Sequence, residues 1–416
     1  MSCIIVGGGI AGFQAALSCR AKWPDKAVTI IDAEGETGYY RTLLPQFMTG
    51  TVTEEQLFFW KGTTDPLLTV RSGLRVVSLD RENRTLGLSN GESISYERLV
   101  IAQGGEPLLP GQLAGPPGEG IFTLRDLTTA RKAKAWLETH RKVLVFGGSL
   151  VGVKTAIHLR QAGYEVTMVI RRGHILLRAL SSEAACVVEE HLRQMGITLC
   201  LNAPLEDIRI EGGAITAIQA GGEWHTCDTL LVAAGIAPDR DFLKGSGLLS
   251  GGELVVSTAL QTLDKHIFAA GDGAVINRGT EQFSPNTWPQ AMAQGRLAGE
   301  NLYAASPTTH RDMTSVNAME LHGLSMVILG PPVAGAEIIA YERPAENVRR
   351  ELFLVGGKPI GGALIGDISA GGTLRALIGA GREIHPGEAS LLKPRAYSVI
   401  RFREQSGRRQ PLLLAP

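Results

Sequence analysis

The chain has 416 residues, of which 44% are hydrophobic and 20% charged, so it is long enough to bury the cores of two or three domains. Its 41 lysines and arginines balance 41 aspartates and glutamates, which argues against bulk electrostatic binding of nucleic acid or of an anionic membrane. The 51 glycines make up a larger share of the chain than the usual share of about 7%, and this excess needs a structural reason.

The cysteines are odd in number and form no CxxC pair, which is typical of a reducing compartment. They are Cys3, Cys19, Cys186, Cys200 and Cys227. We therefore expect a cytoplasmic protein without a disulfide framework. The longest mainly apolar stretch, residues 324–340, contains two prolines and a glutamate, so no transmembrane helix is predicted.

Short β-branched runs bounded by glycine recur along the chain and predict strands that are buried on both faces. They lie at residues 3–6, 28–31, 99–102, 143–146, 166–170, 230–234 and 267–270. Helical patterns at residues 12–22, 152–161 and 289–304 alternate with them. This alternation predicts an α/β fold that is built from βαβ units around parallel sheets.

Residues 4–17 and 143–157 resemble each other, which indicates an internal duplication of a Rossmann-like nucleotide-binding unit. Connectors rich in glycine and proline suggest that the second copy is inserted into the first. We expect a discontinuous first domain of residues 1–108 and 236–313, an inserted domain of residues 109–235, and a smaller α+β domain of residues 314–416 that ends in a basic tail.

The first copy contains a GxGxxG loop between a strand and a helix. Gly7 allows the tight turn, Gly9 lets the backbone approach a pyrophosphate, and Gly12 lets helix and strand pack closely. The pyrophosphate would lie at the helix N-terminus, where free N–H groups attract anions. Asp32 ends the next strand and can accept hydrogen bonds from a ribose diol. These offsets predict a dinucleotide-binding site.

The second copy has the same plan with two changes. Ser149 replaces the middle glycine of the loop, which is tolerated if its φ stays negative. The strand after the loop ends in Arg171 and Arg172 and has no carboxylate for a 2′-hydroxyl, but these arginines could pair with a 2′-phosphate. Arg178 follows in the same loop. An NADPH site, an NADH site and a site that has lost its function all stay open.

Two such units in one chain resemble the FAD-dependent flavoproteins of the pyridine nucleotide-disulfide oxidoreductase superfamily. Matching segments lie at residues 96–111, 227–243, 267–275 and 288–304. The segment YYRTLLPQFMTG at residues 39–50 and the motif Gly361 to Asp367 are most similar to NAD(P)H-dependent rubredoxin and ferredoxin reductases and to the flavin module of the nitrite reductase large subunit.

The resemblance implies FAD in the first unit and NADPH or NADH in the second. It assigns FAD contacts to Gly7, Gly9, Ile10, Ala11, Gly12, Asp32, Arg41, Val77, Ala102, Gly104, Arg125, Gly271, Asp272 and Trp288. Among these, Asp272 would bind the ribitol chain, and Trp288 would lie against the isoalloxazine where a helix N-terminus stabilises negative charge. It assigns NAD(P) contacts to Gly147, Ser149, Leu150, Val151, Gly152, Arg171, Arg172 and Gly235.

Some chemistry of this superfamily is missing. Disulfide reductases and NADH peroxidases of this plan need cysteine near residues 35–48, and this segment has none, so electrons should leave to an external acceptor. No histidine or cysteine spacing predicts a metal site. A lysine–glutamate pair near the flavin of related ferredoxin reductases is replaced by Gln46 and Lys154. We expect Lys154 to supply positive charge near reduced flavin or nicotinamide, unless it simply faces solvent.

The sequence favours an FAD-dependent NAD(P)H oxidoreductase that passes electrons to a rubredoxin- or ferredoxin-like protein. The alternatives are a flavin subunit of a larger redox complex, resembling nitrite reductase or an amine dehydrogenase, and a non-catalytic flavin-binding interaction protein. For its assembly we expect a homodimer or a larger redox complex. The tail at residues 393–409 has six cations and one glutamate, so it is either a docking surface for an acidic partner or an ordinary solvated end.

Overall fold

The computed structural model describes residues 2–113, 118–277, 279, 282–284, 286–309, 316–384, 392, 400–405 and 408–413. The chain forms two compact units. Unit 1 contains residues 1–108, 123–135 and 235–311, and unit 2 contains residues 109–122, 136–234 and 312–416.

Unit 1 is built on a seven-stranded sheet whose centre is parallel. The strand order is β3–β2–β1–β6–β5–β4, and β19 pairs with β6 on its other side. The strands are β1 (Ser2–Val6), β2 (Val28–Ile31), β3 (Leu68–Arg71), β4 (Val76–Asp80), β5 (Thr85–Leu88), β6 (Ser93–Ile101) and β19 (Ile267–Ala269). The predicted runs at residues 3–6, 28–31, 99–102 and 267–270 supply its core strands, which confirms those predictions. Their side chains are buried because both faces of the sheet are covered.

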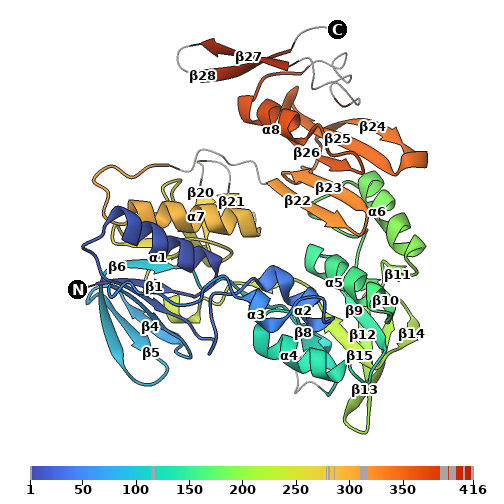
Figure 1. The fold of residues 1–416 in the computed structure, drawn as a ribbon, viewed down its shortest axis with the longest axis horizontal. Coiled ribbons are helices and arrows are strands. Elements are labelled where there is room, and N and C mark those ends of the chain that lie inside the picture. Colours follow the sequence, from blue (N-terminus) through green and yellow to red (C-terminus); the bar gives the residue numbers. More distant parts are fainter. Residues whose placement is uncertain are drawn as a thin grey trace. The chain divides into compact units, whose positions relative to one another are not determined.

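Two long helices lie side by side on this sheet, α1 (Ile10–Lys22) and α7 (Trp288–Asn301) (Figure 1). They touch through their backbones. A β-carbon on Gly295 would lie 2.1 Å from the carbonyl oxygen of Ala11, and one on Gly299 would lie 2.2 Å from that of Ala15. Part of the glycine excess therefore serves this close helix crossing.

Shorter elements complete unit 1. They are η1 (Arg41–Leu43), α2 (Leu44–Met48), α3 (Glu54–Leu57), β7 (Glu106–Pro107), most of α4 (Leu127–Trp136), β16 (Ile236–Ala237), η3 (Asp241–Leu243), β17 (Leu249–Ser250), β18 (Glu253–Val256), β20 (Val275–Asn277) and β21 (Gln282–Phe283). A small core around Tyr39, Leu44 and Leu127 joins the helices η1, α2 and α4.

Unit 2 repeats the βαβ plan. Its first sheet has the order β11–β10–β9–β15–β8, and β9 pairs in parallel with both β10 and β15. The elements of this part are η2 (Gly111–Leu113), β8 (Ile121–Thr123), β9 (Lys142–Phe146), α5 (Leu150–Gln161), β10 (Glu165–Ile170), α6 (Ser182–Gln194), β11 (Thr198–Leu201) and β15 (Thr229–Val232). An antiparallel meander of β12 (Leu205–Glu211), β13 (Ala214–Ala220) and β14 (Glu223–Thr226) packs beside it.

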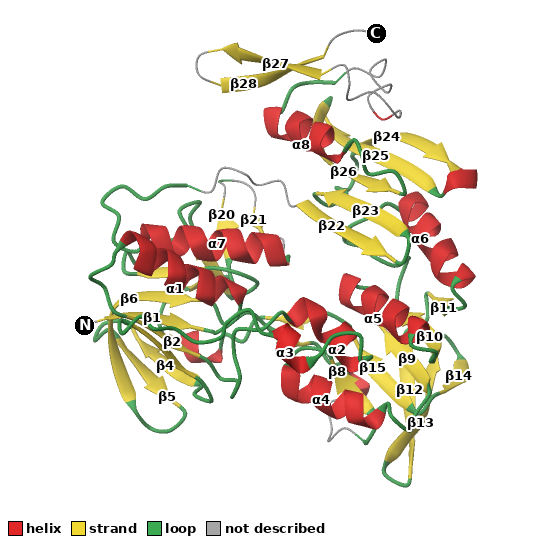
Figure 2. Ribbon diagram, viewed as in Figure 1, coloured by secondary structure: helices red, strands yellow, loops and turns green. Residues whose placement is uncertain are grey.

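A second sheet of unit 2 is antiparallel, with the order β22–β23–β26–β25–β24 (Figure 2). Its elements are β22 (Val316–Leu321), β23 (Leu324–Leu329), β24 (Glu337–Arg343), η4 (Pro344–Glu346), β25 (Val348–Val355), β26 (Lys358–Ile365) and α8 (Gly371–Ala380). Leu374 and Leu377 of α8 pack on Leu352 and Leu364 of this sheet. The charged side chains of Arg350 and Glu351 are wholly buried in β25.

The basic tail contains two short strands that pair antiparallel, β27 (Ile400–Gln405) and β28 (Arg408–Leu413). The remainder of the predicted tail, residues 393–399 and 406–407, lies outside the described residues. In the part of the chain that the structure describes, no helix is long and apolar enough to cross a membrane.

Candidate functional site

The first glycine loop joins β1 to α1 in unit 1, and two of its glycines are needed for backbone packing. Gly7 has a φ of +106°, and a β-carbon there would lie 2.3 Å from the carbonyl oxygen of Ala102. A β-carbon on Gly12 would lie 1.9 Å from the carbonyl oxygen of Gly7. Gly9 differs, because no atom lies within 4 Å of the position that its β-carbon would take.

The space above Gly9 opens onto the N-terminus of α1. Gly9 is the N-cap of this helix and offers no side chain, so the N–H groups of Ile10 and Ala11 have no side-chain cap. Free N–H groups and the helix dipole make this end a site for a phosphate group. The loop geometry therefore fits a pyrophosphate.

Asp32 follows β2 directly and lies beside this loop. Its side chain is only 7% exposed, and its Oδ2 atom has no hydrogen-bond partner among the described residues. A β-carbon on Gly8 would lie 2.4 Å from that oxygen, which shows how close the carboxylate comes to the loop. A buried carboxylate oxygen without a partner is costly. A ribose diol at this place would satisfy it, so the residues present fit the adenosine half of FAD.

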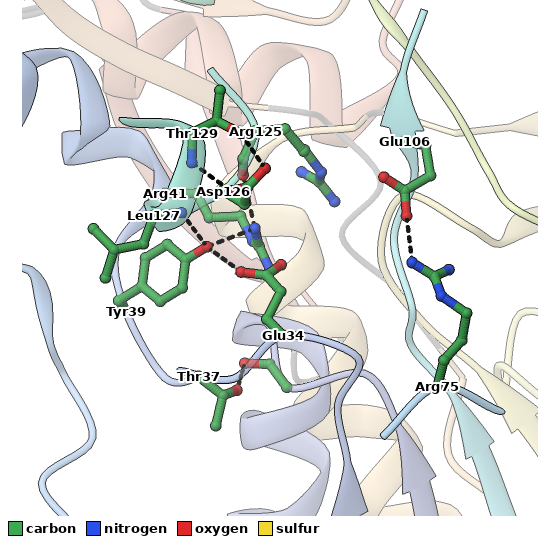
Figure 3. A network of polar contacts seen from close by, with 11 residues as sticks. Glu34, Thr37, Tyr39, Arg41, Arg75, Glu106, Arg125, Asp126, Leu127 and Thr129 are labelled. Carbon is green, nitrogen blue, oxygen red and sulfur yellow. Dashed lines mark hydrogen bonds and ion pairs between the residues drawn. The ribbon is translucent and has the colours of Figure 1, made fainter. Parts of the chain in front are cut away.

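A polar network follows in the next segment of unit 1 (Figure 3). The Tyr39 hydroxyl donates to a Glu34 carboxylate oxygen at 2.5 Å, and Arg41 pairs with the other oxygen of Glu34 at 2.5 Å. Arg41 also donates to the Tyr39 hydroxyl at 2.8 Å and to the Arg125 carbonyl at 2.7 Å. Burial lowers the pKa of Arg41, but Tyr39 and Glu34 outweigh this effect and raise it. Arg41 is therefore held by protein groups and shapes the wall of the site.

Within the described residues the Arg125 guanidinium makes no such hydrogen bond or ion pair, and none of the dashed contacts in Figure 3 reaches it. A β-carbon on Gly104 would lie 2.7 Å from its Nη2 atom, so the absence of a side chain at Gly104 makes room for it. Burial and the nearby Arg41 lower the pKa of Arg125, whereas Asp272 opposes this shift. Burial raises the pKa of Asp272, against the effect of Arg125 and Arg41. Neither the Arg125 guanidinium nor the Asp272 carboxylate has a side-chain hydrogen bond to a described residue, so both can bind the phosphate and hydroxyl groups of a ribityl phosphate.

The turn that carries Asp272 is anchored on α7. The Gly271 N–H donates to Gln294 of α7 at 2.8 Å, which anchors the turn that carries Asp272. Trp288 begins α7, and its ring packs on Tyr40 with centroids 5.5 Å apart and on Phe59 at 6.1 Å. These aromatic contacts would hold Trp288 in place whether or not it touches a ligand.

Four buried side-chain oxygens in the segments that the sequence links to flavin lack partners within the described residues. They belong to Gln46, Gln103, Thr287 and Gln290. Thr287 and Gln290 stand at the N-terminus of α7. The sequence interpretation missed both residues, and it also missed Glu34 and Tyr39 as partners of Arg41. The sequence pointed to these residues only by their position, since each lies within three residues of a predicted contact.

Val77 lies on β4, and its side chain is 51% exposed. The Leu74 N–H donates to the Asp32 carbonyl at 2.9 Å, which brings the beginning of this segment beside the first site. The contact of the Val77 backbone with adenine stays a prediction.

The second glycine loop, between β9 and α5 of unit 2, packs like the first. Gly147 has a φ of +122°, and its β-carbon would lie 2.3 Å from the Ala233 carbonyl oxygen. A β-carbon on Gly152 would lie 2.2 Å from the Gly147 carbonyl oxygen. Ser149 has a φ of −72°, as its tolerance requires, and its hydroxyl donates to the Ala233 carbonyl at 3.1 Å and caps the Gly152 N–H at 3.3 Å.

The other predicted NAD(P) residues are less constrained. Leu150 begins α5, and Val151 is 47% exposed beside it. Arg171 and Arg172 follow β10, are exposed, and make no hydrogen bond or ion pair in the described part of the chain. Gly235 belongs to unit 1, where its carbonyl accepts a hydrogen bond from the Leu108 N–H at 2.9 Å.

Lys154 lies on α5 and is half-buried. Together with His158 and Gln161 it lines an open pocket of about 240 Å³, whose other side is formed by Glu320 of β22 and by His322 of the turn that follows. Burial lowers the pKa of Lys154, and burial followed by the Lys154 charge lowers that of His158. Lys154 forms no ion pair with the residues that the structure describes. Gln46 belongs to unit 1 and Lys154 to unit 2. The replacement of the lysine–glutamate pair of related reductases by these two residues therefore stays a hypothesis.

All five cysteines are free thiols. Cys3 of β1 and Cys19 of α1 are wholly buried. Burial raises the pKa of Cys227 to about 12, and it also raises that of Cys200. Among the described residues, no group of three or more His, Cys, Asp or Glu side chains is placed to hold a metal ion.

Two relatives are similar in sequence to this chain over most of its length. The NADH-rubredoxin oxidoreductase of Clostridium acetobutylicum is 24% identical over 381 residues, which are 90% of this chain and 93% of that protein. The NADH-dependent phenylglyoxylate dehydrogenase subunit epsilon of Aromatoleum evansii is 24% identical over 385 residues, 90% of both chains.

Among solved structures, a chain of the covalent putidaredoxin reductase–putidaredoxin complex matches with a TM-score of 0.88 at 20% identity, and the match covers 95% of this chain and 96% of that one. This likeness confirms the predicted α/β fold. The sequence model of the family described as pyridine nucleotide-disulphide oxidoreductase matches residues 1–295, well over half of the chain. The chain therefore belongs to the pyridine nucleotide-disulphide oxidoreductase family.

Proposed function

We propose that the chain is an FAD-dependent NAD(P)H oxidoreductase that passes electrons to a small rubredoxin- or ferredoxin-like protein. The observation that carries the proposal is the buried Asp32 Oδ2 atom, which has no partner among the described residues and lies beside the open N-terminus of α1. The family and the name of the Clostridium relative support the same reaction class.

FAD, when bound, supplies the step from hydride acceptance to release of single electrons. The chain supplies its position and its charge. Asp32 would accept hydrogen bonds from the ribose diol, and the free N–H groups at the N-terminus of α1 would hold the pyrophosphate. Arg125 would pair with phosphate oxygen and Asp272 with ribityl hydroxyls, while Arg41 keeps the Arg125 backbone in place.

The flavin ring would then lie towards the N-terminus of α7, beside Trp288. The positive end of this helix would stabilise negative charge on the ring, and the unpartnered oxygens of Thr287 and Gln290 could accept its polar hydrogens. In the second unit, the N-terminus of α5 would hold the nicotinamide nucleotide, and Lys154 would add a positive charge. We also propose that the chain has the three domains that the sequence predicts, at residues 1–108 with 236–313, 109–235 and 314–416.

The acceptor is external in this proposal, because residues 35–48 contain no cysteine for an internal relay. The name of the Aromatoleum relative supports one rival, in which the chain is the flavin subunit of a larger complex. The homodimer and the cytoplasmic location belong to the proposal as well.

The experiment for the FAD site compares the wild type with Asp32→Ala after removal of flavin. We expect FAD to bind the wild type stoichiometrically and the variant roughly ten- to a hundredfold more weakly, since a hydrogen bond to a charged group contributes about 1.5–3 kcal/mol. Asp207→Ala, which removes an exposed aspartate of unit 2, is the control. Equal FAD affinity of wild type and Asp32→Ala would exclude this site.

A further inference from the structure

Three arginines gather on the loop that joins β10 to α6. Arg171, Arg172 and Arg178 lie within eight residues, and residues 171–180 contain no acidic side chain. All three are exposed, and none of them makes a hydrogen bond or an ion pair in the described part of unit 2. Like charges at this spacing repel each other, so an anion on the loop would relieve the repulsion.

The arginine pair Arg171–Arg172 is held in a defined turn. The Gly173 N–H donates to the Asn202 side-chain oxygen at 2.8 Å, and the Ala203 N–H donates to the Ile170 carbonyl at 2.9 Å. Asn202 directly follows β11, which pairs with β10 in parallel so that Ile170 stands opposite Leu201. The turn and Asn202 therefore lie together at the carboxyl edge of a parallel sheet, where ligands of such folds bind.

The far end of the loop is tied to the second glycine loop itself. The Leu176 N–H donates to the Gly148 carbonyl at 2.7 Å. The Ile175 N–H donates to Glu189, a buried carboxylate of α6, at 3.2 Å. These bonds fix the arginines relative to the loop that would hold a pyrophosphate.

The internal duplication allows the end of β10 to be compared with the end of β2. Asp32 follows Ile31 at the end of β2, and Arg171 follows Ile170 at the end of β10. The strand register matches Ile31 with Val169, because Val6 stands opposite Ile31 and Phe146 stands opposite Val169. Ile170 therefore takes the place of Asp32 and offers no carboxylate to a ribose diol, and Arg171 presents its guanidinium one residue further along. A guanidinium pairs with a phosphate through two parallel hydrogen bonds, which it cannot form with a diol.

We propose that Asn202 positions the Arg171–Arg172 turn to receive a 2′-phosphate, which makes NADPH the donor rather than NADH. This inference rests on the proposed function. It separates the chain from the two relatives described above, whose names specify NADH. Asn202 acts here through the turn and need not touch the nucleotide.

The test measures binding of adenosine 2′,5′-bisphosphate and of adenosine 5′-monophosphate to the flavin-loaded protein by calorimetry. We expect the wild type to bind the bisphosphate at least about tenfold more tightly, as charge-assisted hydrogen bonds provide. Asn202→Ala should reduce this ratio several-fold and raise the KM for NADPH, while kcat and the KM for NADH stay unchanged.

Two further variants separate the Asn202 side chain from its backbone, whose φ is +55°. Asn202→Gly keeps the left-handed backbone but loses the acceptor, so it should lower the ratio as Asn202→Ala does and cover the case in which alanine impairs folding. Asn202→Asp keeps the acceptor but adds a negative charge beside the arginines, so it should also lower the ratio. Asn90→Ala is the control, since Asn90 accepts the Glu92 N–H in a turn of unit 1.

A wild-type ratio near one would overturn the NADPH preference. An unchanged ratio in all the Asn202 variants would overturn the positioning role and leave the preference to the arginines alone. If neither NADPH nor NADH binds to the wild type, the second site is not a nucleotide site, and the proposed function fails together with the inference.

Discussion

Gly12 lies so close to Gly7 that a β-carbon on Gly12 would stand 1.9 Å from the Gly7 carbonyl oxygen. Gly152 and Gly147 repeat this contact in unit 2, where the corresponding distance is 2.2 Å. The last glycine of each loop therefore serves the packing of helix on strand. In our proposal the middle position, Gly9 or Ser149, faces the ligand.

This division of roles predicts opposite effects for two glycine substitutions. Gly12→Ala should destabilise the flavin-free protein by about 1–3 kcal/mol or more, because the added methyl group meets backbone that cannot move away. Gly9→Ala should leave that stability unchanged but weaken FAD binding, because its methyl group occupies the open space above α1. Urea unfolding and flavin titration measure the two effects. Gly35→Ala, in open space on an exposed loop, is the control, and equal behaviour of Gly9→Ala and Gly12→Ala would contradict the assignment.

We expect the Asp272 carboxyl group to make the free energy of unfolding depend on pH. Burial raises its pKa in the folded protein above the ordinary value of 3.8, so folding is favoured below that value and loses this contribution as the pH rises through the raised pKa. Asp272→Asn should therefore melt at a higher temperature than the wild type at neutral pH, and the difference should vanish at low pH. Thermal unfolding of the flavin-free proteins across this range checks the sign. A gain that is the same at every pH would refute the burial argument.

The same variant should bind FAD less tightly, because an amide is a weaker acceptor for ribityl hydroxyls than a carboxylate. A stabilised protein with a weaker cofactor site is the usual consequence of removing a strained functional group.

Two substitutions of Ser149 distinguish its role as a helix cap from its effect on nucleotide binding. Ser149→Ala removes a cap and should cost unit 2 about 1 kcal/mol, whereas Ser149→Gly should cost only a few tenths of that. Ser149→Gly should also bind NADPH several-fold more tightly, because glycine lets the backbone approach the pyrophosphate. Urea unfolding and calorimetry test both statements. If Ser149→Gly bound NADPH no better than the wild type, the serine would not be limiting access.

We expect substitution of Lys154 to change the rate of flavin reduction. Lys154→Met should slow the reduction of flavin by NAD(P)H by at least about tenfold if the lysine stabilises developing negative charge. It should not lower stability, since it removes a half-buried ammonium that has no ion-pair partner among the described residues. Lys154→Arg should keep most of the rate, and the exposed Lys132→Met serves as the control. An unchanged rate in Lys154→Met would leave the lysine without a role in hydride transfer.

The sequence predicted those parts of the fold that depend on local pattern. The run at residues 3–6 became β1, whose Cys3, Ile4 and Ile5 are wholly buried, because a strand covered on both faces must be apolar throughout. Asp32 follows the second strand, as its offset from the first loop predicted, and its carboxylate lies beside that loop, while its contact with a ribose stays a prediction. The helix predicted from residue 12 begins two residues earlier, because the end of the glycine motif already forms its first turn.

Features that depend on distant residues were beyond the sequence. The predicted helix end at residue 304 was wrong: α7 ends at Asn301, whose amide donates to the carbonyls of Ala259 and Thr308. Arg41 meets the Arg125 carbonyl across 84 positions of chain, and Gly173 meets Asn202 across 29. The pair Arg350 and Glu351 had the composition of a surface strand but lies in the core.

The most direct test of the account is to mix the FAD-loaded protein anaerobically with NADPH and NADH and then to add oxidised rubredoxin or ferredoxin. We predict that the flavin absorbance bleaches, that NADPH achieves this at a lower concentration than NADH, and that the colour returns while the added protein becomes reduced. A flavin that stays oxidised with both nucleotides would contradict the account and favour a flavin-binding interaction protein.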